Sequence, residues 1–125
     1  SMTALAWVSN IALLVHILSV IGLLILLLLQ ISKSPRRIHP GALHSGLTAL
    51  VAGLVIVGVR PPLHAQNPNK WPLLNNGWVS VQFAILIVIL VLGYQNFKKR
   101  EFKNSVWITM IVLTVVNILI AFIWK

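Results

Sequence analysis

The chain has 125 residues, of which 58% are hydrophobic and only 9% are charged, with ten Lys and Arg residues against one acidic residue, Glu101. An ordinary soluble domain needs more charged surface than this, so the composition excludes that class and favours a polytopic membrane protein. The formal charge of +9 does not indicate nucleic-acid binding, because the basic residues lie in short segments between long apolar runs.

The first apolar run extends from about residue 4 to 30 and is too long for the core of a signal peptide. We therefore expect a retained transmembrane helix. The second run extends from about 40 to 59. Pro40 suits its first turn, where a missing N–H costs nothing. The sequence Arg60-Pro61-Pro62 predicts its end, because proline disrupts a helix interior.

A connection rich in Pro and Asn, from about residue 60 to 76, precedes the third run. The third and fourth runs extend from about 77 to 95 and from about 105 to 124. Each run is long enough to cross a hydrocarbon layer ~30 Å thick. We predict an all-α fold with one domain over residues 1–125, an antiparallel bundle of four transmembrane helices.

The basic residues are distributed unequally between the two predicted sides. The first and third connections, on one side, carry seven Lys and Arg residues: Lys33, Arg36, Arg37, Lys98, Lys99, Arg100 and Lys103. The other side carries only Arg60, Lys70 and Lys125. This bias predicts that these two connections are cytoplasmic and that both termini are extracytoplasmic. The same basic residues are candidates for docking to anionic lipid headgroups.

The second run has small residues at every fourth position: Gly41, Ser45, Ala49 and Gly53. Four residues slightly exceed one helical turn, so these positions form a nearly continuous strip. Little hydrophobic gain comes from bringing helices together in lipid, and small residues allow the close backbone approach that replaces it. We expect this strip to be the helix-packing surface.

Several polar side chains lie at similar predicted depths within the runs. His16 and Asn117 lie ~21 and ~18 Å along their helices from the cytoplasmic ends, so they are a candidate pair. Asn10 and Gln82 lie ~8–9 Å from the outer ends and form a second candidate pair. A third level near the cytoplasmic end contains His44, Ser45, Thr48 and Thr109.

Two interpretations of these polar groups remain open. The first is interhelical hydrogen bonding, which contributes about 0.6 kcal/mol per pair on average and fixes the register of the helices. The second is a polar path for an ion or small solute, since ionisable groups within a membrane are often functional. We favour the first interpretation.

The residues for catalysis or cofactor binding are sparse. The only acid, Glu101, lies in a basic connection, and the adjacent His44 and Ser45 diverge by about 100° around a helix. The absence of cysteine excludes thiol chemistry. A haem with two axial ligands does not fit His16 and His44, whose predicted depths differ by ~15 Å. We expect no enzyme, no cofactor and no metal site, with single-histidine haem ligation as a minor alternative.

Three segments carry a resemblance to a group of known proteins. They are His16 in the first run, the stretch HPGALHSGLTALVAGL at 39–54, and NILIAFIW at 117–124. They resemble small four-helix integral membrane proteins of actinobacteria, which have a mid-helix His, an H-G-A-L-T-x-L-x-T-G-L run and an N-V-x-x-A-x-x-W pattern. Where that family often has V-K-L, this chain has Val81-Gln82-Phe83. The resemblance implies a multi-pass protein of the bacterial cell (inner) membrane and names no reaction.

Two functional classes follow from these observations. The first is a non-enzymatic membrane protein that associates with itself or with a larger membrane complex. The second is a small oligomeric transporter or channel for an ion or small solute. The shortage of charged residues within the four runs favours the first class.

Overall fold

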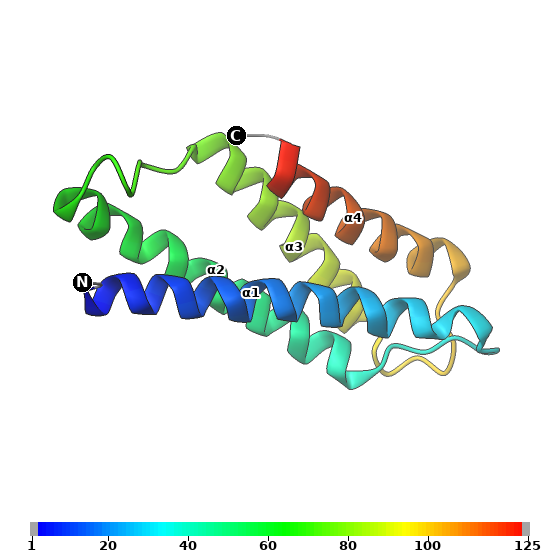
Figure 1. Ribbon diagram of the computed structural model, residues 1–125. Coiled ribbons are helices and arrows are strands. Elements are labelled where there is room, and N and C mark those ends of the chain that lie inside the picture. Colours follow the sequence, from blue (N-terminus) through cyan, green and yellow to red (C-terminus); the bar gives the residue numbers. More distant parts are fainter. Residues whose placement is uncertain (1–2, 124–125) are drawn as a thin grey trace.

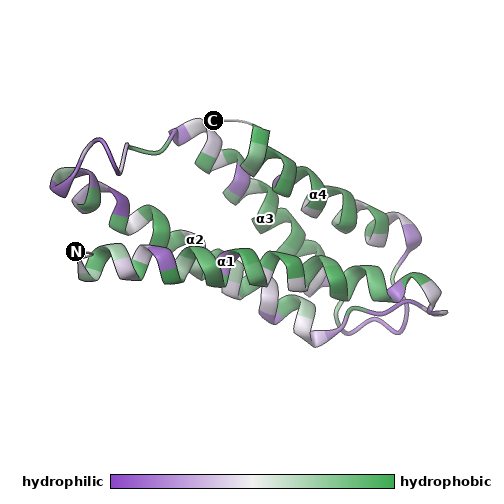
Figure 2. Cartoon of the chain, viewed as in Figure 1, coloured by the Kyte–Doolittle hydropathy of each residue, from purple (hydrophilic) through white to green (hydrophobic). Residues whose placement is uncertain are grey.

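The computed structural model describes residues 3–123 and places four long helices in this part of the chain (Figure 1). They are α1 (Ala4–Leu28), α2 (Pro40–Gln66), α3 (Asn76–Asn96) and α4 (Asn104–Ile123), with a 3-10 helix η1 (Leu29–Ser32) that continues α1. No strand occurs between residues 3 and 123, so the all-α prediction is confirmed. All four helices are long and apolar enough to cross a membrane. Figure 2 shows hydrophilic residues concentrated in the connections and at the helix ends, with isolated ones within the helices. Residue 124, the predicted end of the fourth run, lies outside the described part.

Side chains at the starts of three helices satisfy main-chain N–H groups that have no partner within the helix. Thr3 Oγ1 accepts from the N–H of Ala6, and Asn75 Oδ1 accepts from the N–H of Trp78. At the start of α2, the acceptor is His39 Nδ1, 2.8 Å from the nitrogen of Gly41. These caps explain why α1, α2 and α3 begin where they do.

The predicted end of the second helix is wrong. The helix does not stop at residue 59 but continues through Pro61 and Pro62 to Gln66. Each proline removes one intrahelical hydrogen bond. Both prolines are exposed, whereas Leu63 directly after them has 0% of its surface exposed. The burial of this side chain and the contacts of the following connection offset the lost bonds.

The connection over residues 67–75 folds back onto the last two turns of α2. His64 Nδ1 donates to the main-chain oxygen of Trp71 at 3.0 Å, and Arg60 Nη1 donates to that of Pro72 at 2.8 Å. The Arg60 guanidinium also lies over the Trp71 ring, 5.3 Å from its centroid. The connection is therefore held against α2 and is shorter than the sequence predicted.

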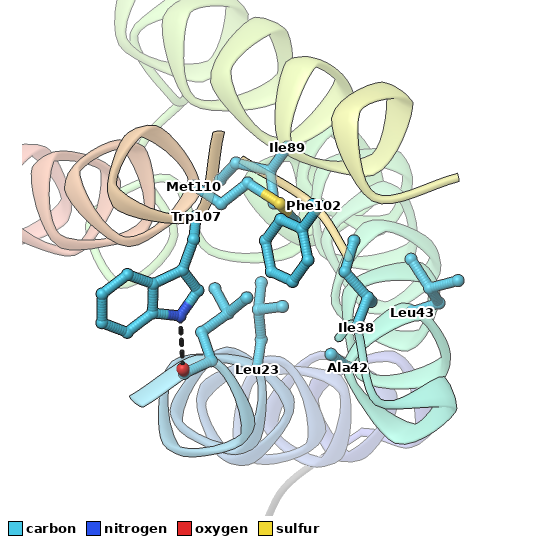
Figure 3. Close-up of a cluster of buried hydrophobic side chains, with 9 residues drawn as sticks. Leu23, Ile38, Ala42, Leu43, Ile89, Phe102, Trp107 and Met110 are labelled. Carbon is cyan, nitrogen blue, oxygen red and sulfur yellow. Dashed lines mark hydrogen bonds between the residues drawn. The ribbon is translucent and has the colours of Figure 1, made fainter. Parts of the chain in front are cut away.

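The main hydrophobic core lies at the end of the molecule where the 33–39 and 97–103 connections meet (Figures 1 and 3). Ile38 and Phe102 belong to these connections and are both buried. They pack with residues from all four helices: Leu23, Leu27, Ala42, Leu43, Ile89, Trp107 and Met110. The connections at this end are thus part of the packed core, although they also carry most of the basic residues.

The strip of small residues on α2 lies against α1, and these two helices form the most extensive interface in the molecule. A Cβ atom at Gly22 of α1 would be 3.4 Å from Ser45 Oγ, and Ala49 has 0% of its surface exposed. At the two ends of the strip, a Cβ at Gly41 would lie 3.0 Å from Leu26 Cδ1, and one at Gly53 would lie 3.4 Å from His16 Cε1.

The contact between α2 and α3 contains a reciprocal arrangement that the sequence analysis missed. Leu90 of α3 lies over Gly46 of α2, where an added Cβ would be 2.7 Å from Leu90 Cδ2. Conversely, Leu43 of α2 lies over Gly93 of α3, where an added Cβ would be 2.6 Å from Leu43 Cδ2. Real Cβ atoms do not approach so closely, so each glycine makes room for a leucine of the other helix.

Candidate functional site

His16 lies at the interface of α1 and α2, and its partner is a main-chain oxygen. Its Nδ1 lies 2.7 Å from the oxygen of Ala49. A carbonyl oxygen only accepts, so Nδ1 carries the hydrogen, and in the neutral ring Nε2 is an acceptor. Gly53, one turn after Ala49, has no side chain to cover this oxygen. The small residues of α2 therefore allow the histidine to reach the backbone.

The expected His16–Asn117 pair does not form, because Asn117 is engaged at the interface of α3 and α4. Gln82 Nε2 donates to the main-chain oxygen of Asn117 at 3.1 Å. Reciprocally, Asn117 Nδ2 donates to the main-chain oxygen of Gln82 at 3.2 Å. One turn away, Trp78 Nε1 donates to the oxygen of Ile120 at 3.0 Å. Three side-chain donors thus connect these two helices. Asn117 Oδ1 is buried without a hydrogen-bond partner.

The expected pairing of Gln82 with Asn10 is also corrected. Asn10 lies on an exposed part of α1, and Gln82 lies on α3. Within the described residues, α1 and α3 have no Cα atoms within 8 Å of each other. Similar depth along two helices does not make them neighbours, and the sequence analysis matched these residues by depth alone.

The third predicted polar level consists of separate, local hydrogen bonds. Thr48 Oγ1 donates to the oxygen of His44 at 2.8 Å, and Thr109 Oγ1 donates to that of Ser105 at 2.6 Å. Each bond stays within its own helix, one turn back, as is common for Thr in apolar helices. His44, Thr48 and Thr109 are exposed on the outer surface.

Trp107 and Arg36 make polar contacts that the sequence analysis did not identify. They lie at the end of the molecule where the 33–39 and 97–103 connections carry seven Lys and Arg residues, called the basic end below. Trp107 Nε1 donates to the oxygen of Leu27 at 2.8 Å, which joins α4 to the end of α1 (Figure 3). The Arg36 guanidinium lies over the Trp107 ring, 4.2 Å from its centroid, within the range of a cation–π contact.

The guanidinium of Arg36 also donates to main-chain oxygens of η1, the 3-10 helix that continues α1. Its Nε donates to the oxygen of Gln30, and its Nη2 donates to that of Ile31, both at 3.1 Å. Its Nη1 donates to Asn104 Oδ1 at the start of α4. Helix C-terminal oxygens attract Arg and Lys, and this is the signal that could have identified Arg36. The sequence does not show which of several neighbouring basic residues takes this position.

The surface of residues 3–123 includes two hollows of different character. One is a groove of about 530 Å³ between α1 and α2, lined by Val8, Ile11, Ala12, Val15, Leu47, Thr48, Val51, Ala52 and Val55. The other is a pocket of about 560 Å³ at the basic end, lined by Gln30, Arg37, Ile38, His39, Pro40, Phe97 and Lys98. The groove is almost entirely apolar, whereas the pocket combines apolar, basic and hydrogen-bonding side chains.

In residues 3–123, no three His or acidic side chains gather where they could hold a metal ion.

Comparison with known proteins finds no relative of this chain. No family model, no curated protein and no solved structure matches the chain.

Proposed function

We propose that the protein crosses a bacterial cell membrane as an antiparallel bundle of four helices and acts by association within the bilayer. Its partner in this proposal is a second copy of the chain, and a larger complex is the alternative partner. The observation that carries the proposal is that polar side chains within the helices donate hydrogen bonds to main-chain oxygens. His16, Gln82 and Asn117 bond main-chain oxygens of neighbouring helices, which favours a packing role for them over a solute path.

The outer surface of the helices is apolar along most of its length, which suits contact with lipid and with other helices. The groove between α1 and α2 is a concave part of this surface. Ala12 and Ala52 lie in it, and small residues at such positions allow another helix to approach closely. These features support the groove as the contact surface for a second copy.

Cross-linking in native membranes tests this association. Because the chain has no cysteine, single cysteines at Val15 and Val51, which line the groove, are the only reactive thiols. Cysteine at Val112 is the matched control, because it is exposed on α4 and does not line the groove. We expect dimers with the groove cysteines and little dimer with the control.

Equal dimer yields at groove and control positions would show random collision. A chain that stays monomeric at all lipid ratios, measured by single-molecule photobleaching, would overturn self-association. Solute flux that depends on His16 would instead support transport, and a Soret band that His16→Ala removes would support haem binding.

The proposed orientation places the basic end in the cytoplasm and both termini outside, because seven of the ten Lys and Arg residues lie in the two connections at that end. Cysteines at Ser34 and Asn67 report the two sides. An impermeant thiol reagent should label Asn67→Cys in intact cells, and should label Ser34→Cys only after the membrane is opened. The reverse pattern would overturn the orientation.

A further inference from the structure

We propose that the pocket at the basic end binds the phosphate group of an anionic phospholipid, with Arg37 and Lys98 as its cationic ligands. This proposal rests on the proposed membrane-spanning arrangement. It goes further by assigning one defined site to one class of lipid. The site is the pocket of about 560 Å³ described above.

Two separate connections build this pocket. Arg37 comes from the 33–39 connection and Lys98 from the 97–103 connection, and Figure 1 shows these segments together at one end of the molecule. The main-chain N–H of Phe102 donates to the oxygen of Arg36 at 3.3 Å, which links the two connections directly. The N–H of Arg37 donates to Gln30 Oε1 at 3.1 Å and so holds the backbone of that residue. The two cations therefore line one pocket, and hydrogen bonds hold the backbone on the Arg37 side of it.

The basic side chains at this end differ in whether the protein already provides them with hydrogen-bond partners. The Arg36 guanidinium donates to two main-chain oxygens of η1 and to Asn104, so the protein itself uses its donors. Arg37 and Lys98 are exposed, and no salt bridge or cation–π contact involves either of them among the described residues. Two unneutralised cations at one pocket favour an anionic ligand, and a phosphate accepts charge-assisted hydrogen bonds from both Arg and Lys.

His39 supplies a third donor. Its Nδ1 accepts from the N–H of Gly41 at 2.8 Å and therefore has no hydrogen. In the neutral ring the hydrogen is then on Nε2, which is left to donate. His39 lines the pocket, so an uncharged N–H complements the two cationic groups toward phosphate oxygens.

The remaining lining favours a lipid over free phosphate. Ile38, Pro40 and Phe97 give the pocket apolar walls beside its cationic groups. An inorganic ion gains nothing from such walls, whereas the glycerol and upper acyl carbons of a phospholipid bury apolar surface against them. The pocket also lies at the end of helices long enough to cross a membrane, and in the proposed membrane-spanning arrangement that end faces the headgroups.

Native mass spectrometry of the full chain, released from detergent with phosphatidylglycerol or phosphatidylcholine, tests the proposal. We expect the wild-type chain to bind phosphatidylglycerol preferentially. The variant Arg37→Gln/Lys98→Gln should bind it about 10- to 30-fold more weakly, because each basic residue near a headgroup contributes ~1 kcal/mol. Lys33→Gln/Arg100→Gln is the matched control. It removes the same charge from the same end outside the pocket and should change binding less than threefold.

Each other outcome overturns the proposal. Equal losses in the two double variants would show a diffuse surface-charge effect, and a wild-type chain without preference for phosphatidylglycerol would show no site. Displacement of the lipid by millimolar inorganic phosphate would identify the free ion as the ligand. If the double variant does not fold, the single variant Lys98→Gln tests the proposal instead. Among the described residues the Lys98 side chain makes no hydrogen bond, so this substitution should leave the fold intact and weaken phosphatidylglycerol binding. These measurements do not require a dimer or a particular orientation, so they can succeed where the proposed function fails.

Discussion

Gly93 offers a quantitative test of the packing between α2 and α3. Replacing it with Ala adds one Cβ atom 2.6 Å from Leu43 Cδ2 and 3.4 Å from Met110 Cε. Ordinary carbon contacts lie at 3.5–4.0 Å, so Leu43 must move by about 1 Å. Leu43 and Met110 are both buried in the core, where side chains are close-packed and even small volume changes are felt. Overpacking of this kind costs ~1–3 kcal/mol.

The same substitution also stabilises the helix, because Ala is better than Gly in a helix interior by about 0.5–1 kcal/mol. Gly58→Ala isolates that gain, since Gly58 lies within α2 and a Cβ there meets nothing within 4 Å. The propensity terms cancel between the two variants. Gly93→Ala should therefore be less stable than Gly58→Ala by ~1–3 kcal/mol, measured by reversible unfolding in mixed micelles.

The contact itself is tested in a background that lacks the leucine side chain. In Leu43→Ala, the added methyl group at Gly93 meets no Cδ2 atom, so the penalty of Gly93→Ala should largely disappear. A free energy of unfolding for Gly93→Ala within about 0.5 kcal/mol of that for Gly58→Ala would refute the reasoning. It would mean that Leu43 does not occupy the space over Gly93.

Three further predictions concern the polar contacts. Trp107→Phe loses the hydrogen bond to α1 and should lower the free energy of unfolding by about 0.5–1.5 kcal/mol in thermal or denaturant unfolding. His16→Ala and Asn117→Ala should each destabilise, and their effects should add to within ~0.5 kcal/mol, because the two residues have no shared partner. A coupling above that value would restore the pair that the sequence suggested. Arg36→Lys keeps the charge but loses the planar fork of donors, so it should cost ~1–3 kcal/mol in the same assay, whereas Arg37→Lys should be close to neutral.

The four helices could be predicted because the length and composition of an apolar run are local properties. The end of α2 could not. Pro61 and Pro62 are strong local signals for a stop, and only the tertiary burial of Leu63 and the returning connection explain why the helix continues. Local propensity yields to packing at such positions, and the packing partners are distant in the sequence.

Three of the residues expected in an intramembrane polar site make hydrogen bonds between helices, but not with the expected partners. His16, Gln82 and Asn117 all form interhelical hydrogen bonds, yet none has the partner that matched depth suggested. Two residues at equal depth meet only if their helices are neighbours, and a single sequence does not give the order of helices around a bundle. Gly46 escaped notice for a similar reason, since its role depends on Leu90 of another helix.

The use of main-chain oxygens as acceptors has a consequence for how this chain tolerates mutation. Ala49, Leu27 and Ile120 each contribute an oxygen that any other residue would also provide. In a saturation mutagenesis screen, the donors should therefore be intolerant, while the acceptor positions should be restricted only by side-chain volume. The acceptor positions would then vary over evolution without any compensating change at the donors, so these interhelical contacts would leave little trace in residue covariation.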